Sequence, residues 1–144
     1  MSRGIFIVDT NVLVAGLITP SNDAPTALIV DAMLEGRLVY LLSGDLLQEY
    51  RDVLLRPRLC RYHGLGEGDV DQILAELVAN AIWVKPSADI SSSSSPDPQD
   101  AHLWALLTCD PNAVLITGDR LLLENPMQGR SIISPAAWID YLGR

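Results

Sequence analysis

The sequence contains no long apolar run. No stretch approaches the roughly 20 consecutive apolar residues that a membrane-spanning helix needs. Only four apolar residues, Ile5 to Val8, stand before Asp9 near the N-terminus, and these are too few for the core of a secretory signal peptide. We therefore expect a cytoplasmic protein with no membrane segment.

Cysteine and lysine are both scarce. Cys60 and Cys109 are the only cysteines and show no paired CxxC spacing, so neither a disulfide scaffold nor a zinc site is indicated. Lys85 is the only lysine, and 10 basic residues face 18 acidic ones, for a net charge of −8. This charge argues against a generally basic nucleic-acid-binding surface. It does not exclude an enzyme that meets phosphates through bound metal ions, because the carboxylates that hold such ions make a chain more acidic.

The hydrophobic pattern alternates between two kinds of element. Short continuous apolar runs predict buried strands, and capping, proline and glycine signals delimit helices between them. The predicted strands cover residues 5–8, 38–42, 81–84, 113–117 and 131–133, and the predicted helices cover 21–36, 43–56, 66–81, 100–109 and 134–142. This order predicts a three-layer α/β/α fold with a central, mainly parallel sheet of four or five strands. The length of 144 residues suits one domain over 1–144.

Acidic residues stand where this fold would place a ligand site. In open parallel sheets, ligands bind outside the carboxyl ends of the strands. Asp9 directly follows the first strand, and Asp119 follows the fourth. Asp100 begins a helix after a serine-rich loop, with Asp97 three residues earlier, and Glu49 lies within the second predicted helix. If the strands that lead to Asp9 and Asp119 are neighbours, carboxylates from four segments converge on one edge.

Each of these acids also has an ordinary interpretation. Asp9 and Asp100 could cap helices, Asp119 could be a turn residue, and Glu49 could be a solvated helix residue. Together the acids are harder to explain in this way, because gathered carboxylates repel one another unless a cation neutralises them. A set of oxygen ligands without histidine or cysteine favours Mg²⁺ or Mn²⁺ over zinc. His102 lies close enough in sequence to support such a site.

Four stretches carry a resemblance to a known family. DTNVLVAG, LLQEYRDVLLRPR, PDPQDAHLWAL and LITGDRLLL resemble, in this order, the motifs of PIN-domain ribonucleases. The resemblance spans nearly the whole chain and is nearest to the bacterial VapC-like branch of toxin–antitoxin toxins. It departs from the family in the PQD stretch, where a more heavily acidic run is common, and in the polar TCDPNAV link.

The resemblance implies roles for individual residues. The catalytic acidic quartet of the family falls on Asp9, Glu49, Asp100 and Asp119. Among these, Asp9, Asp100 and Asp119 match direct metal ligands, and Asp97 matches a further acidic position that binds metal directly or through water. Asn11 and Thr117 match polar positions that orient the carboxylates.

The same resemblance implies an activity and partners. It predicts a metal-dependent endoribonuclease that uses Mg²⁺ or Mn²⁺ to hydrolyse RNA phosphodiester bonds. It also predicts the toxin role of a toxin–antitoxin pair, a small antitoxin protein as partner, and a homodimer. Four neighbouring arginines could guide the RNA backbone, or could simply form a solvated helix end: Arg51, Arg56, Arg58 and Arg61.

Three other interpretations stay open. A HAD-type phosphatase also places an Asp after its first strand, but Asn11 stands where its second acid is expected. A receiver domain of a two-component system carries a Lys-Pro pair like Lys85-Pro86, but needs a phospho-accepting Asp before it, after its third strand. A PIN-like domain that has lost its activity could serve as a binding module, although the intact quartet argues against this.

Overall fold

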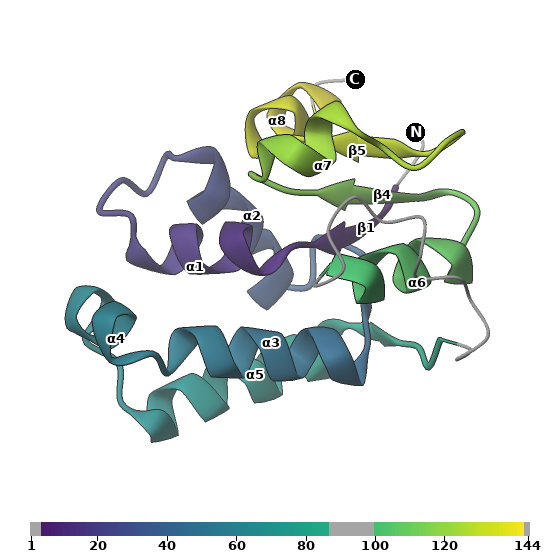
Figure 1. Cartoon of the computed structure of the whole chain (residues 1–144). Coiled ribbons are helices and arrows are strands. Elements are labelled where there is room, and N and C mark those ends of the chain that lie inside the picture. Colours follow the sequence, from purple (N-terminus) through teal and green to yellow (C-terminus); the bar gives the residue numbers. More distant parts are fainter. Residues whose placement is uncertain (1–3, 87–99, 143–144) are drawn as a thin grey trace.

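The computed structural model describes residues 4–86 and 100–142, and its elements alternate between strands and helices (Figure 1). The strands are β1 Ile5–Val8, β2 Leu41–Leu42, β3 Ile82–Trp83, β4 Ala113–Ile116 and β5 Ser131–Ile133. The helices are α1 Thr10–Ile18, α2 Pro25–Leu34, α3 Gly44–Leu54, α4 Pro57–His63, α5 Glu67–Asn80, α6 Ala101–Cys109, α7 Arg120–Glu124 and α8 Pro135–Leu142. The predicted Asp97 and the serine run at 91–95 lie outside the described residues.

The strands pair in parallel. A three-stranded sheet has the order β1-β4-β5, and β2 pairs with β3 beside it. An isolated parallel bridge between Phe6 and Tyr40 links β1 to the segment that leads into β2. In the β1–β4 register, Ile5 lies opposite Ala113 and Val8 opposite Ile116. The two strands therefore end side by side, which confirms that Asp9 and Asp119 follow neighbouring strands.

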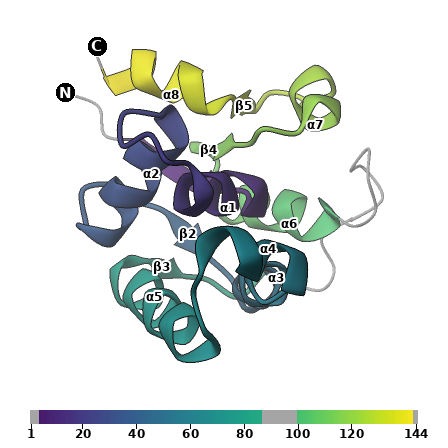
Figure 2. The same ribbon diagram turned by 90° about the vertical axis from the view of Figure 1, so that its left-hand side faces the viewer.

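Helices cover both faces of the strands. Figure 2 shows α2 and α6 on opposite sides of β4. Helix α6 contacts β1 and β4, whereas α2 packs against α5 and α8. This arrangement confirms the predicted α/β/α class, in which a mostly parallel sheet is sheltered on both faces.

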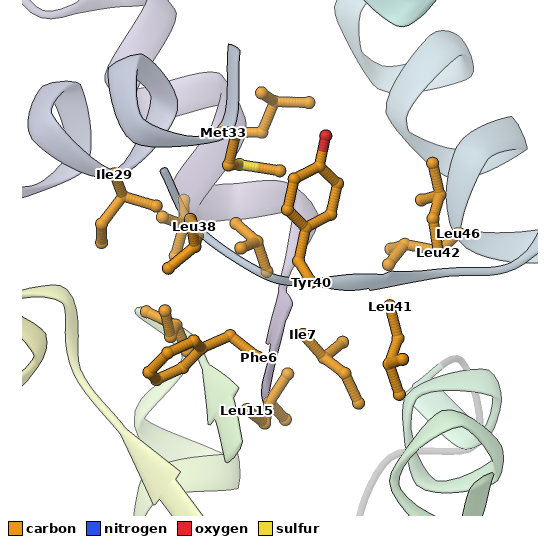
Figure 3. Close-up of a cluster of buried hydrophobic side chains, with 14 of the residues drawn as sticks. Phe6, Ile7, Ile29, Met33, Leu38, Tyr40, Leu41, Leu42, Leu46 and Leu115 are labelled. Carbon is orange, nitrogen blue, oxygen red and sulfur yellow. The ribbon is translucent and has the colours of Figure 1, made fainter. Parts of the chain in front are cut away.

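The core forms where β1 crosses between the helices. Phe6, Ile7 and Val8 are all buried, as expected for a continuous apolar strand. Figure 3 shows β1 side chains meeting those of α2, α3 and the β2 region, and the labelled members of this cluster are Phe6, Ile7, Ile29, Met33, Leu38, Tyr40, Leu41, Leu42, Leu46 and Leu115. Burial on all sides fixes the end of β1, and with it the start of the polar segment that follows.

The structure adds three helices that the sequence pattern did not predict: α1, α4 and α7. The predicted helix over 21–36 is confirmed but begins later, at Pro25. Helix α3 ends at Leu54, before Pro57 as expected, and Pro57 then occupies the first turn of α4. The strands predicted at 38–42 and 81–84 shorten to two residues each, and β3 is exposed instead of buried.

Helices α1 and α2 approach closely at Gly16. A Cβ atom at this position would stand 2.5 Å from the Thr26 carbonyl oxygen and 2.5 Å from the Val30 Cγ2 atom.

No helix in the described part of the chain has the length and apolar character needed to cross a membrane.

Candidate active site

Asp9 lies at the point where β1 passes into α1. Its backbone N–H donates to the Ile116 carbonyl at 3.0 Å, which continues the β1–β4 ladder by one residue. Asp9 is the N-cap of α1, and its Oδ1 accepts a hydrogen bond from the Thr10 backbone N–H at 2.7 Å. The side chain is buried, with only 4% of the residue exposed. The ordinary interpretation of Asp9 as a helix cap is therefore correct, and it does not exclude a functional role.

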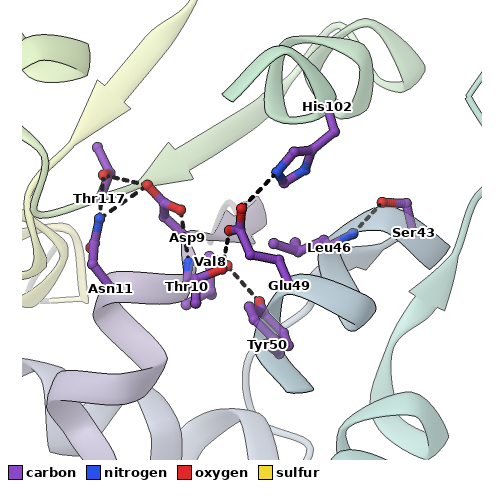
Figure 4. Close-up of polar contacts among 10 residues, drawn as sticks. All are labelled: Val8, Asp9, Thr10, Asn11, Ser43, Leu46, Glu49, Tyr50, His102 and Thr117. Atoms are coloured by element: carbon purple, nitrogen blue, oxygen red, sulfur yellow. Dashed lines mark hydrogen bonds and ion pairs between the residues drawn. The ribbon is translucent and has the colours of Figure 1, made fainter. Parts of the chain in front are cut away.

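Two polar residues hold the other carboxylate oxygen of Asp9. Oδ2 accepts hydrogen bonds from the Thr117 hydroxyl at 2.7 Å and from the Asn11 Nδ2 at 3.1 Å (Figure 4). The Asn11 Oδ1 in turn accepts the Gly118 N–H at 2.8 Å. Asn11 and Thr117 thus connect the residues that follow β1 and β4 around the Asp9 carboxylate.

Glu49 reaches the same place from α3. Ser43 caps this helix, because its Oγ accepts the Leu46 N–H at 3.2 Å. Tyr50, the residue after Glu49, is fully buried. Its hydroxyl donates a hydrogen bond to the Val8 carbonyl at 2.5 Å, which joins α3 to the last residue of β1. This contact fixes the turn of α3 that carries Glu49.

The Glu49 carboxylate has a partner on each oxygen (Figure 4). The Thr10 hydroxyl donates a short hydrogen bond to Oε1, and the His102 Nε2 lies 3.3 Å from Oε2. Thr10 therefore binds Glu49 with its side chain and Asp9 with its backbone. The His102 Nδ1 is buried and has no hydrogen-bond partner among the described residues.

Asp100 and Asp119 both stand at helix N-termini. Asp119 caps α7, and its Oδ1 accepts the Leu121 N–H at 2.9 Å. Asp100 occupies the N-cap position of α6, but its side chain makes no capping hydrogen bond. With Asp9 at α1, three of the four acids of this region stand at helix N-termini, where the partial positive charge favours a carboxylate.

All four predicted catalytic acids line one cleft. Its volume is about 390 Å³, and its lining comprises Asp9, Thr10, Asn11, Val14, Ala15, Glu49, Val53, Arg56, Asp100 and Asp119. The acids come from four segments that are distant in sequence. The convergence that was inferred from the ends of the predicted strands is therefore present in the structure.

Burial and hydrogen bonding act on the acids in opposite directions. Burial raises the pKa of Asp9, and the charge of Glu49 raises it further, although the hydrogen bonds from Thr117 and Thr10 oppose the shift. The hydrogen bond from His102 lowers the pKa of Glu49, against the effect of its partial burial. Burial alone would lower the pKa of His102, but the hydrogen bond and charge of Glu49 raise it overall. An ionised Glu49 is thus stabilised, whereas an ionised Asp9 is held at a cost.

The chemistry of these side chains suits a hard divalent cation. The cleft offers carboxylate oxygens without a cysteine, and such ligands are typical of Mg²⁺ and Mn²⁺. The Asp9 Oδ1 accepts one hydrogen bond, so a second lone pair remains for a cation. Among the described residues, however, no three acidic, histidine or cysteine side chains are arranged as a ready metal site. The chemistry of the donor set fits such a cation.

The arginines separate into different environments. Arg56 lines the cleft. The Arg51 Nε donates to Asp71 at 2.9 Å, and its Nη2 lies 3.2 Å from Glu67, so this guanidinium joins α3 to α5 instead. Arg58 and Arg61 lie on α4 and are exposed, outside the lining of the cleft.

Sequence reasoning did not identify Thr10 or Tyr50 as parts of this site, and treated His102 only as a supporting candidate. Thr10 stands next to Asp9 in sequence, which was the available signal, but its contact with Glu49 spans 39 positions. Tyr50 falls within the predicted helix over 43–56, and no sequence pattern indicates that its hydroxyl reaches Val8.

Comparison with known proteins gives one family. The family model described as PIN domain matches residues 6–121. No curated protein sequence matches the chain. The match takes in all four acids of the cleft and both elements, β1 and β4, that bring the first and last of them together. Because the match is to a PIN domain, it argues against the HAD-type phosphatase and receiver-domain interpretations. The chain belongs to the PIN-domain family, whose members are generally nucleases that use divalent metal ions.

Proposed function

We propose that this protein is a metal-dependent endoribonuclease that hydrolyses RNA phosphodiester bonds, and that residues 1–144 act as one nuclease domain. One observation carries the proposal: Asp9, Glu49, Asp100 and Asp119 line the same cleft although they come from separate segments. Their spacing along the chain gives no local structural reason for this convergence. The membership in a family of nucleases supports a catalytic reason.

Asp9, Asp100 and Asp119 would hold Mg²⁺ or Mn²⁺, and Asp97 is a further candidate that lies outside the described residues. A bound ion of this kind lowers the pKa of water, positions a phosphate and offsets charge on the leaving oxygen. The protein supplies orientation. Asn11, Thr117 and the Thr10 N–H fix the Asp9 carboxylate from three sides.

Glu49 is suited to orienting the water that attacks the phosphate. Its carboxylate is held by Thr10 on one oxygen and His102 on the other, and its lowered pKa keeps it ionised and able to accept a hydrogen bond from the water. Arg56, on the same cleft, can take a phosphate oxygen of the bound strand. We assign Asp9, Asp100 and Asp119 to metal binding and Glu49 to the water.

The test is cleavage of a fluorogenic RNA with Mn²⁺ by the wild type and by Asp9→Asn. The substitution keeps the shape of the side chain and removes its charge, so cleavage should be almost completely lost. Asp31→Asn is the matched control, since Asp31 is exposed on α2 and lies outside the cleft. A variant Asp9→Asn that cuts at the wild-type rate would remove Asp9 from the mechanism. A wild type that binds RNA without cutting it would support the binding-module alternative.

We also propose that this ribonuclease is the VapC-like toxin of a toxin–antitoxin pair, that it forms a homodimer, and that a small antitoxin protein covers the acidic cleft. The motif resemblance supports this role. The adjacent open reading frame should encode a small protein that co-purifies with the chain and inhibits cleavage. Sedimentation of the isolated chain as a monomer at micromolar concentration would exclude the homodimer.

A further inference from the structure

The active-site cleft is a groove between two helices. Its lining on α1 comprises Thr10, Asn11, Val14 and Ala15, and its lining on α3 comprises Glu49 and Val53. The residues of each set share one helix face. Arg56 also lines the groove, and it lies beyond the end of α3 at Leu54, as the N-cap residue of α4. Helix α4 contacts both α1 and α3, and Figure 1 shows it at their common end.

Helix α4 concentrates positive charge on an acidic protein. Its sequence, PRLCRYH, contains no acidic residue, whereas the whole chain has a net charge of −8. Arg56, Arg58 and Arg61 form no ion pair in the part of the chain that the structure describes. Other arginines do: Arg37 pairs with Glu35, and Arg51 with Asp71. The charges near α4 are thus available to an external anion.

An aromatic ring stands among these charges. Tyr62 is 73% exposed, the highest value among the large hydrophobic side chains described. Arg58 and Tyr62 are four residues apart, so they share a face of α4, and Arg61 lies beside them. The other side of the helix is anchored, because the Cys60 thiol and the His63 ring both bond to the Leu54 carbonyl, at 3.6 Å and 2.8 Å. This anchoring keeps Tyr62 on the outside.

We propose that Arg56, Arg58, Arg61 and Tyr62 form an α4 platform that binds single-stranded RNA as it leaves the catalytic groove. Arginine guanidinium groups match phosphate oxygens, and an exposed aromatic ring stacks on an unpaired base. A duplex hides the faces of its bases, so the ring favours a single strand. The inference rests on the proposed ribonuclease function, because Arg56 lines the groove and is also the N-cap of α4, so the platform adjoins the place where the strand would be cut. An acidic protein segment would match the arginines but would not need this continuity with the groove.

The binding test uses a 5′-fluorescein-labelled single-stranded oligoribonucleotide, fluorescence anisotropy and the full chain, in EDTA so that the RNA is not cut. Tyr62→Leu should weaken binding by roughly 5- to 160-fold, the range expected when one base no longer stacks on an aromatic ring. Tyr62→Phe keeps the ring and should bind like the wild type. Circular dichroism and urea denaturation of each variant establish that it is folded.

The arginines are tested through salt dependence. For single-stranded RNA, removing one arginine that binds a phosphate reduces the slope of log K against log salt by about 0.7. Arg58→Gln and Arg61→Gln should each reduce the slope by this amount. Arg37→Gln, an exposed arginine on another part of the surface, should leave it unchanged.

Three results would overturn the α4 platform: no RNA binding by the wild type at low salt, equal binding by Tyr62→Leu and wild type, or equal slopes for Arg58→Gln and Arg37→Gln. If Tyr62→Leu leaves RNA binding unchanged but changes the sedimentation coefficient, the surface is a protein interface and the inference fails. Loss of cleavage in Asp9→Asn together with unchanged binding in Tyr62→Leu rejects only the platform. Tyr62-dependent binding without any cleavage rejects only the ribonuclease proposal.

Discussion

Asp9 performs a structural task and presents a functional group at the same position. As an N-cap it satisfies the Thr10 N–H with Oδ1, and through Oδ2 it ties Asn11 and Thr117 together. Burial raises its pKa, so the ionised side chain is held at a cost that a bound cation would relieve. A residue that served only as a cap would not need this burial.

The first prediction concerns the stability of Asp9→Asn without metal. The pKa of Asp9 is raised in the folded protein, whereas its ordinary value is 3.8. Between these two values the folded state binds more protons than the unfolded state, so the free energy of unfolding falls as the pH rises. Asparagine does not titrate, so the free energy of unfolding of Asp9→Asn does not fall with pH for this reason. In EDTA at pH 7, Asp9→Asn should therefore be more stable than the wild type.

The difference should shrink as the pH is lowered towards 3.8, below which Asp9 is protonated in both states. Urea denaturation at a series of pH values measures it. Asp31→Asn serves again as control and should show no such trend. A lower stability of Asp9→Asn at pH 7 would mean that the hydrogen bonds of the carboxylate outweigh the cost of burying its charge.

The second prediction separates positioning from packing at His102. His102→Leu removes the hydrogen-bond donor to Glu49, while His102→Gln retains one. Loss of a group that orients a catalytic carboxylate typically lowers activity about 10- to 100-fold. We expect kcat to fall in this range in His102→Leu and to recover in part in His102→Gln, and the pKa of Glu49 to rise towards its ordinary 4.5 in His102→Leu. Equal kcat values in both variants would reduce His102 to a packing residue.

At the scale of elements, the sequence predicted the strands better than the helices that flank the site. β1 and β4 are short, continuous and apolar, so burial on both faces determines them whatever their neighbours are. Helix α1 was missed because β-branched residues and Gly16 give it poor helix propensity, and packing against α2 stabilises it instead. The contact of Glu49 with Thr10, the first residue of α1, depends on the presence of this helix. Sequence patterns therefore indicated which acids converge, but not what holds them.

The third prediction tests the contact between α1 and α2. In an open helix, Gly→Ala would stabilise by about 0.5–1 kcal/mol. At Gly16 the new methyl group would meet the Thr26 carbonyl oxygen at 2.5 Å, and a backbone atom cannot turn away. Overpacking of this kind costs about 1–3 kcal/mol. Gly16→Ala should therefore lower the urea midpoint.

Gly68→Ala provides the matched control, because Gly68 lies in α5 and a Cβ atom there would meet nothing within 4 Å. It should leave the midpoint unchanged or raise it slightly. Since α1 carries Thr10 and Asn11, a displaced α1 should also reduce RNA cleavage in Gly16→Ala. Stability of Gly16→Ala equal to that of Gly68→Ala would show that α1 and α2 can separate freely.

For the whole molecule, charge is distributed unevenly around one groove. Four carboxylates and Arg56 line this groove, and the chain as a whole carries −8. Such a surface repels RNA at long range, so affinity must come from cations held at the carboxylates and from the arginines near α4. Divalent ions would then serve binding as well as chemistry.

The fourth prediction is that Mn²⁺ or Mg²⁺ stabilises the folded protein through Asp9, Asp100 and Asp119. A ligand that binds only the native state at a hundredfold excess over its dissociation constant contributes about 2.7 kcal/mol. For a chain of this length that corresponds to a rise in Tm of about 5–10 °C. NaCl at matched ionic strength should give a much smaller rise, because screening acts on all charges weakly, whereas a bound divalent ion neutralises the buried Asp9 directly. Asp9→Asn should lose most of the Mn²⁺-dependent rise, and Asp31→Asn should keep it. An equal rise in both variants would place the bound ion outside the groove, and the convergence of the four acids would then need a different explanation.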